Sequence, residues 1–155
     1  MVVMVRLLGE LEARTGERPV PAPAHPQGPA LLAWLALHPG EHDRGPLSAL
    51  LWPALPPSGA RAELRSAAWA VRRALAPHDA AVLDGRTTIG LRCVTDLGQF
   101  KAHAAAGDTA GALALCRGPL LAGFDEHEWV LAARHDHAER VAALRAPAAA
   151  RVRLS

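Results

Sequence analysis

Residues 60–75, ARAELRSAAWAVRRAL, decide the fold. Their apolar members recur at the spacing of a helix face that packs on a core. These members are Leu64, Ala68, Val71 and Leu75. The arginines recur at the same spacing on another face, with Trp69 among them, and Pro77 closes the helix. The stretch therefore predicts an amphipathic helix whose outer face is cationic.

The chain before this helix predicts a small sheet and two further helices. Residues 1–14 are rich in Val and Leu and are typical of two strands, with a third short strand at residues 18–20. PALLAWLALH, residues 29–38, starts on a proline and has no polar face, so we expect a buried helix. A second helix fits residues 44–52 and stops at Pro53.

The chain after the cationic helix predicts a hairpin and then helices. Val82-Leu83 and Thr88-Ile89 flank an Asp84-Gly85 turn, which is a strong hairpin signal. From Asp96 onward the apolar periodicity is helical, and we expect helices at about 97–106, 109–117 and 126–145.

A short sheet, three helices and a hairpin, in this order, are the layout of a winged helix-turn-helix. We therefore expect an α+β, mostly helical protein that begins with an antiparallel sheet. In this interpretation residues 1–94 form the winged-helix domain, residues 95–146 form a helical extension, and residues 147–155 form a flexible tail.

Charge and cysteine usage limit the classes of function. The 155 residues carry a net charge of only +2, but residues 61–92 hold six arginines and three acids. Residues 96–146 hold seven acids and five bases, so a nucleic-acid-binding part joined to a different partner surface is expected. The two cysteines have no metal-ligand spacing, and no signal peptide or membrane span is apparent, which predicts a cytoplasmic protein.

Several motifs resemble those of one known family. They are VRLLGELEAR (5–14), LLAWLALHPG (31–40), LSALLWPALPPSGAR (47–61), VRRAL (71–75), Asp96, Phe100, Gly107-Asp108, RGPLL (117–121) and Trp129. In order and spacing they resemble the Streptomyces antibiotic regulatory proteins, the SARP family of bacterial transcriptional activators. Members of that family join an OmpR-like winged helix to a helical, TPR-like bacterial transcriptional activation domain, which is usually longer than the extension here.

The resemblance implies duplex DNA as a partner and nucleoid association when DNA is bound. It also implies that the helical extension contacts RNA polymerase or a second subunit. A helix fits the major groove, and arginine suits both phosphate and guanine. Arg61 and Arg65 are expected to reach bases, and Arg72 and Arg73 to hold the backbone. The complete set of expected DNA-binding residues is Arg61, Arg65, Ser66, Trp69, Arg72, Arg73, Arg86, Thr87 and Thr88.

Three points leave alternatives open. Trp69 either packs on DNA or is covered by the hairpin or a partner chain, and the second is favoured because exposed Trp is rare. Arg86 at the hairpin tip is either a phosphate contact or part of a plain surface turn. Alanines at three positions of the cationic helix favour an alternative function, a protein-interaction module with weak or lost DNA binding. These alanines are Ala62, Ala67 and Ala70.

The remaining expectations concern partners and chemistry. A shortened helical extension is expected to expose apolar side chains and to form a homodimer through them. The candidates are Leu120, Leu121, Phe124 and Trp129. Eight histidines suggest metal binding, but neither His127 nor the pair His135 and His137 has the ligand spacing of a helical metal site. No nucleotide-binding or nucleophile motif is present, so neither enzyme activity nor a cofactor is expected.

Overall fold

The computed structural model describes residues 2–146 and combines six α-helices, about half of these residues, with small sheets. The chain forms two compact units. The first comprises Met1–Val5 and Glu12–Thr95, and the second comprises Arg6–Leu11 and Asp96–Ser155. The expected tail at residues 147–155 lies outside the described residues. Within residues 2–146, no helix has the length and apolar character that crossing a membrane requires.

The first unit begins with a four-stranded sheet in the order β3-β2-β1-β7. β1 (Val3–Arg6), β2 (Glu12–Thr15) and β3 (Arg18–Pro19) lie where strands were predicted. β7 (Val94–Thr95) was not predicted and pairs parallel with β1, so the expectation of a purely antiparallel sheet is wrong at this edge. A parallel partner needs a long crossover connection, and no local sequence signal marks such a pair.

Three helices form the core of the first unit. α1 (Gly28–Leu37) is buried on several sides, as its missing polar face predicted. Both α1 and α2 (Arg44–Leu51) pack against α3 (Pro57–Leu75). α3 begins earlier than the predicted stretch because Pro57 fits the first turn of a helix. The predicted core face of α3 is confirmed, with each member at most 2 % exposed: Leu64, Ala68, Val71 and Leu75.

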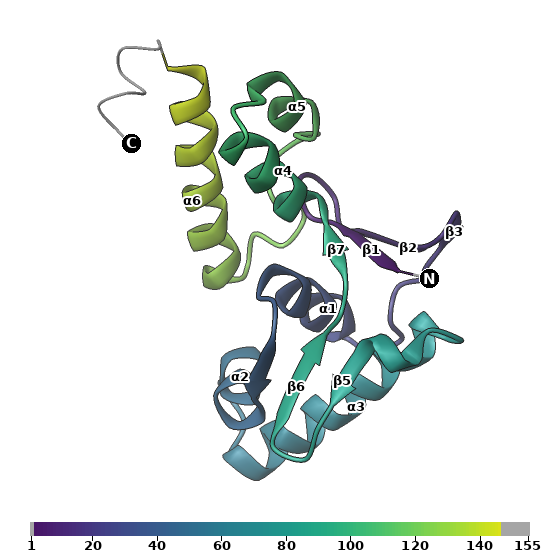
Figure 1. Ribbon diagram of the computed structural model, residues 1–155. Helices are drawn as coiled ribbons and strands as arrows, with labels where there is room; N and C mark the ends of the chain where they lie inside the picture. The colour runs from purple at the N-terminus through teal and green to yellow at the C-terminus, as the bar shows by residue number, and fades with distance from the viewer. Residues whose placement is uncertain (1, 147–155) are drawn as a thin grey trace. The chain divides into compact units, whose positions relative to one another are not determined.

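The predicted hairpin is confirmed and lies beside α3 (Figure 1). A 3₁₀ turn, η1 (Asp79–Ala81), leads into its first strand, β5 (Val82–Asp84), which pairs antiparallel with β6 (Thr88–Leu91). β6 pairs on its other side with β4 (Glu41–Asp43), a three-residue strand that the sequence did not reveal. The hairpin is therefore anchored to the segment that enters α2.

Gly90 makes this anchoring possible. A Cβ atom on Gly90 would lie 2.5 Å from the carbonyl oxygen of Gly40, closer than side-chain carbons come to backbone. Only glycine lets the two backbones approach in this way. Next to it, the backbone N–H of Arg44 donates to the carbonyl of Thr87 at 3.0 Å. The hairpin turn is thus held close to the start of α2 by main-chain contacts.

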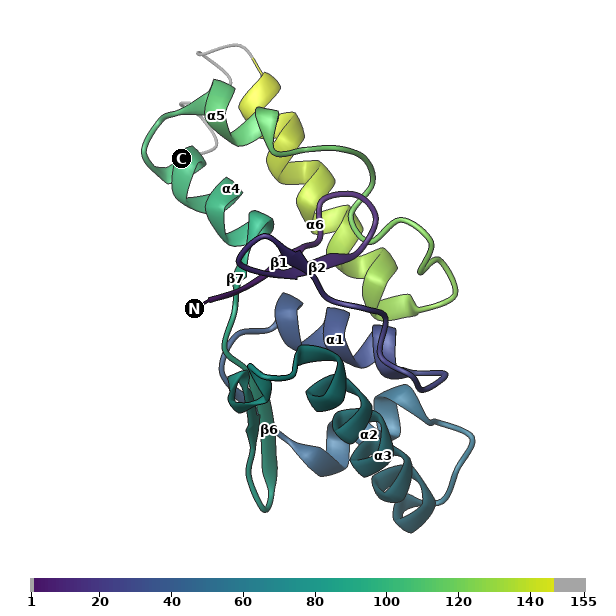
Figure 2. The ribbon, with the colours of Figure 1, turned by 90° about the vertical axis from the view of Figure 1, so that its right-hand side faces the viewer.

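The second unit contains α4 (Asp96–Ala105), α5 (Thr109–Ala114) and α6 (Glu128–Arg145), which lie alongside one another in Figures 1 and 2. All three helices were predicted, with ends that differ by a few residues. α6 is long but buries few side chains, because only Val130 and His137 are buried among its described residues.

The loop between β1 and β2 is part of the second unit. Leu7 and Leu8 are fully buried, and their backbone N–H groups donate to the Asp96 carboxylate at 2.6 and 3.0 Å. The N–H groups of Arg117 and Leu121 donate to the carbonyls of Leu8 and Leu7 at 3.0 and 2.8 Å. Asp96 is itself 3 % exposed and satisfies two buried amides that would otherwise lack partners.

Candidate nucleic-acid interface

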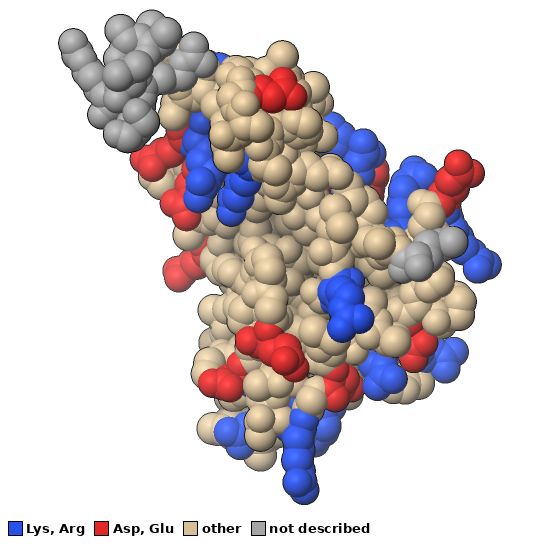
Figure 3. Space-filling model, in the orientation of Figure 1, with Lys and Arg blue, Asp and Glu red and all other residues tan. Residues whose placement is uncertain are grey.

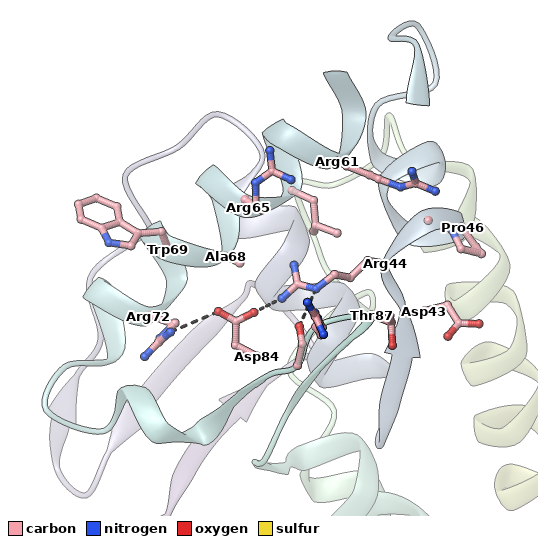
Figure 4. A pocket seen from close by; sticks show the side chains of 14 residues that line it. Asp43, Arg44, Pro46, Arg61, Arg65, Ala68, Trp69, Arg72, Asp84 and Thr87 are labelled. Atoms are coloured by element: carbon pink, nitrogen blue, oxygen red, sulfur yellow. Dashed lines mark hydrogen bonds and ion pairs between the residues drawn. The ribbon is translucent and has the colours of Figure 1, made fainter. Parts of the chain in front are cut away.

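A hollow of about 740 Å³ opens on the first unit between α3, the start of α2 and the turn of the β5–β6 hairpin. Figure 4 shows side chains from all three elements pointing toward it. It is lined by Asp43, Arg44, Gly45, Pro46, Arg61, Leu64, Arg65, Ala68, Trp69, Arg72, Asp84, Gly85, Arg86 and Thr87.

Helix spacing explains how α3 contributes to this hollow. Arg61, Arg65 and Trp69 follow one another at intervals of four residues, so they lie on one stripe of the helix. All three are exposed, while the core-facing side of the same helix is buried. The amphipathic pattern of the sequence therefore places the cationic stripe on the open side, as predicted.

The lining is electropositive. It carries five arginines and two aspartates, a net of three positive charges. Arg61, Arg65 and Arg86 form no ion pair with any residue in the part of the chain that the structure describes, so their charges are directed at solvent. Unpaired guanidinium groups around an open hollow suit an anion with several oxygens, such as a chain of phosphates.

Two other arginines of the hollow share one carboxylate. Asp84 accepts from Nη2 of Arg44 and, through its second oxygen, from Nη1 of Arg72 at 3.2 Å (Figure 4). Arg44 also donates through Nε to the carbonyl of Gly85 at 3.0 Å, and Arg72 lies 3.4 Å from Asp79. Burial, and then the nearby charge of Arg65, lower the pKa of Arg44. A partly buried guanidinium with a second arginine nearby is stabilised by an anionic partner, and Asp84 supplies one here.

Six of the nine expected DNA-binding residues line the hollow: Arg61, Arg65, Trp69, Arg72, Arg86 and Thr87. The other three do not. Ser66 and Arg73 are exposed on α3 outside it, and Thr88 is half-buried and donates to Oε1 of Glu41 at 3.3 Å. The sequence interpretation missed Arg44 and Asp84. Asp84 was visible only as a turn residue, and no local spacing links it to an arginine forty residues earlier.

Within this chain the hairpin does not cover Trp69, and the other possibility that the sequence interpretation favoured, covering by a partner chain, stays a prediction. Its side chain is 60 % exposed, and the guanidinium of Arg73 lies over its ring at 4.8 Å from the centroid. Trp69 lines the same hollow as the hairpin turn, but the turn leaves most of its ring open. An exposed aromatic ring beside an arginine is a surface that binds planar or apolar groups.

The alanines of α3 do not argue against a binding surface. Ala67 and Ala70 are buried at 0 % and 5 % exposed and belong to the core face, so they were wrongly counted as surface positions. Only Ala62 of the three is exposed. The weight that these alanines gave to the alternative function is therefore reduced.

The expected partner surface of the second unit is partly wrong. Leu120 and Leu121 are 1 % and 0 % exposed, because they pack inside the unit next to the loop at Leu7. Phe124 and Trp129 are half-buried.

A second hollow of about 830 Å³ borders α6, and in it the Cys116 sulfur lies 3.7 Å from Nε2 of His137. Among the described residues, no three His, Cys, Asp or Glu side chains gather as a metal site would require.

The surface charge is otherwise mixed. Figure 3 shows acidic and basic side chains interspersed around α3, β5 and β6 on the face that it draws, with uncharged surface between them. The face that Figure 3 draws therefore carries no broad basic area.

Comparison with known proteins gives a structural likeness only. No family model matches the chain, and no curated protein matches it. The solved structure of Mycobacterium tuberculosis EmbR in complex with a low affinity phosphopeptide is similar, with a TM-score of 0.75 and 26% sequence identity. The match covers 92% of this chain but 43% of the EmbR chain. The likeness supports a mixed α+β fold of the kind expected for a SARP-like regulator.

Proposed function

We propose that the chain is a DNA-binding transcription regulator of the SARP type. In this proposal the first unit is an OmpR-like winged helix-turn-helix, α3 is its recognition helix and the β5–β6 hairpin is its wing. The proposal is supported by the likeness to EmbR and by the order of the elements. Its role is binding rather than catalysis.

The observation that carries the proposal is the stripe of unpaired arginines on α3 beside the hairpin turn. Arg61 and Arg65 lie toward the start of the helix, the end that commonly enters the major groove, where arginine pairs with guanine. Arg86 and Thr87 at the turn are placed to contact phosphate or sugar. Since only Arg61 and Arg65 are assigned to bases, we expect a modest preference for one sequence over another.

The second unit is proposed as a TPR-like, protein-facing segment that contacts RNA polymerase or a second copy of the chain. Its support is α6, an 18-residue helix of which only Val130 and His137 are buried within the described chain. A long helix with one face unpacked suits a partner helix. Leu131, which is 48 % exposed on α6, replaces Leu120 and Leu121 as the apolar candidate. Light scattering over a wide concentration range tests for the homodimer.

The proposed DNA binding is tested by fluorescence anisotropy with a labelled random duplex at low and moderate salt. Binding should weaken linearly on a logarithmic salt scale, because each phosphate contact releases condensed counterions. The double variant Arg61→Ala/Arg65→Ala should lose most of the preference for a duplex obtained by selection over the random duplex, because these arginines are proposed to reach bases. Arg14→Ala/Arg18→Ala is the matched control, since both residues are exposed arginines of β2 and β3.

The same assay separates the alternative function. If the natural chain shows no salt-sensitive binding to random duplex, and none to any duplex in a genomic selection, the DNA-binding proposal is wrong. The chain would then be a protein-interaction module. Because EmbR was solved with a phosphopeptide, a labelled phosphopeptide is the second probe in that case.

A further inference from the structure

The side chain of Asp84 has an unusual position for an acid beside a proposed DNA-binding surface. Both of its carboxylate oxygens face guanidinium groups, one from Arg44 on α2 and one from Arg72 on α3. Two arginines converging on one small oxyanion are also the arrangement by which proteins hold a phosphate group. Figure 4 shows this trio on the wall of the hollow, between Trp69 and Thr87.

The hairpin does not need Asp84 to keep its place. β6 pairs with β4 over three residue pairs, and the Arg44 N–H donates to the Thr87 carbonyl at 3.0 Å. Nε of Arg44 binds the Gly85 carbonyl as well. These contacts hold the turn and the Arg44 side chain whether or not position 84 is charged. The carboxylate therefore acts as a counter-ion for the two arginines and is not needed to hold the hairpin in position.

The ion pair with Arg72 is the more easily exchanged of the two. The side chains of Arg72 and Asp84 remain 41% and 31% exposed, and ion pairs open to water contribute little to stability. The Arg44 side chain is only 15% exposed, so its charge needs an anionic partner, whether that is the Asp84 carboxylate or a phosphate. A phosphate brought to the hollow by a duplex carries the same charge as the carboxylate and offers more acceptor oxygens. Exchange of one oxyanion for the other leaves both arginines paired.

We infer that Arg44 and Arg72 form a phosphate-binding site for the nucleic-acid backbone, and that Asp84 occupies this site in the free chain. The inference rests on the proposed function and adds a residue, Asp84, that weakens the binding of DNA. Asp84 lowers the affinity for every duplex alike, because the displaced group competes with phosphate and not with a base. It also keeps the two arginines ordered until the duplex arrives.

Asp84→Asn tests the inference. Asparagine has nearly the same size and keeps one oxygen that accepts a hydrogen bond, but it no longer competes as an anion. We expect random and selected duplexes to bind about 3-fold to 10-fold more tightly at moderate salt, with a salt slope steeper by about 0.9 for each additional phosphate that the protein neutralises. In the double variant Asp84→Asn/Arg72→Ala, most of this increase in affinity should disappear.

Asp43→Asn is the matched control. Asp43 lines the same hollow, so its replacement changes the net charge by the same amount and leaves Asp84 on Arg44 and Arg72. An equal increase in affinity for Asp43→Asn would mean that general electrostatics, and not the release of this site, strengthens binding. Unchanged affinity and salt slope for Asp84→Asn would show that the carboxylate is only a structural ion pair. Either result overturns the inference.

A measurement without DNA keeps the inference distinct from the proposed function. Inorganic phosphate should raise the melting temperature of Asp84→Asn more than that of the natural chain, since only the variant leaves the site open to the anion. If no duplex binds yet phosphate behaves in this way, the proposed function fails and the anion site stands. If Asp84→Asn is not folded by circular dichroism, Asp84→Ser replaces it in both assays, and equal responses of that variant and the natural chain would refute the site.

Discussion

Nη1 of Arg72 lies 3.2 Å from Oδ2 of Asp84, so an arginine that the sequence assigns to DNA is held by the hairpin in the free chain. The arginines of α3 are therefore not equivalent. Arg61 and Arg65 face the hollow without an acid partner among the described residues, whereas Arg72 must exchange one anion for another. Because of this difference in pairing, alanine substitutions of Arg65 and Arg72 are expected to change DNA binding in different ways.

Arg65→Ala is expected to reduce binding at one operator position by about 1–3 kcal/mol and to relax the base preference there, because arginine near the start of a recognition helix pairs with guanine. Arg72→Ala should weaken all duplexes alike and reduce the salt slope by about one. Binding of a selected duplex and a random duplex, each over a salt series, measures both. Equal effects of the two substitutions on both duplexes would contradict this division of roles.

Trp69→Ala is expected to leave stability within about 0.5 kcal/mol of the natural chain, because the side chain is 60 % exposed. It should nevertheless weaken duplex binding and remove most of the fluorescence change that a duplex causes. Trp34→Phe is the control and should leave the response to a duplex unchanged, since Trp34 is half-buried against His38, with ring centroids 4.3 Å apart, and lies outside the hollow. A large fall in the melting temperature of Trp69→Ala would mean that Trp69 is packed in solution after all.

Asp96→Asn is expected to lower the free energy of unfolding by about 2 kcal/mol, because an amide NH₂ cannot accept the bond that one buried backbone N–H donates. Urea denaturation measures the change. Asp125→Asn is the control, because Asp125 is largely exposed, pairs only at the surface with Arg134, and should matter little. Similar losses for the two variants would show that the Asp96 contacts with Leu7 and Leu8 contribute no more than a surface ion pair.

His137 is expected to make stability depend on pH. Burial lowers its pKa below the ordinary value of 6.5, against an opposing effect of Asp96 and with help from Arg140 and Lys101. The ring packs on Phe100 and on the Cys116 sulfur, so the folded state favours the neutral form. The unfolded chain takes up the proton first as pH falls below 6.5, and stability should decrease there.

Thermal unfolding between neutral and mildly acidic pH measures this dependence. In His137→Leu the part of the pH dependence between pH 6.5 and the lower pKa of the folded state should be missing. His135→Leu is the control, because His135 is exposed on the same helix. An unaltered pH profile in His137→Leu would assign the dependence to other groups.

Gly90→Ala is expected to destabilise the first unit by about 2 kcal/mol or more. The Cβ atom of the alanine would collide with the Gly40 carbonyl oxygen and push β4 away from β6. Gly59→Ala is the matched control in the first turn of α3, where a Cβ meets ordinary contacts of 3.7 Å or more. That variant should be neutral or slightly more stable. Equal melting temperatures for both variants would contradict the role of Gly90.

Periodicity predicted what repeats locally, and this covers most of the fold. The core face of α3, the hairpin at Asp84-Gly85 and the three helices after Asp96 all follow from spacing and turn chemistry. Periodicity also placed Arg61 and Arg65 on the open face. It could not reveal β4 or β7, because strands of two or three residues carry no pattern and depend on partners far along the chain.

The partners of the site residues were equally hidden. Arg44 and Asp84 are forty residues apart, and nothing in either neighbourhood marks a pair. Leu120 and Leu121 look like an exposed apolar pair in sequence, but both are buried, and the Leu121 N–H donates to the carbonyl of the distant Leu7. In each case the missing information is a contact between distant segments, which composition and spacing do not encode.

The loop at Leu7 and Leu8 also constrains how the chain is made. The ribosome synthesises these residues well before Asp96, whose carboxylate binds them and which lies 89 and 88 positions later. Until that residue has emerged, two buried amides and two leucines have only water as a partner. We therefore expect the second unit to acquire protection from hydrogen exchange only after synthesis has passed Asp96, and a chain ending at Thr95 to expose Leu7 and Leu8 and to aggregate.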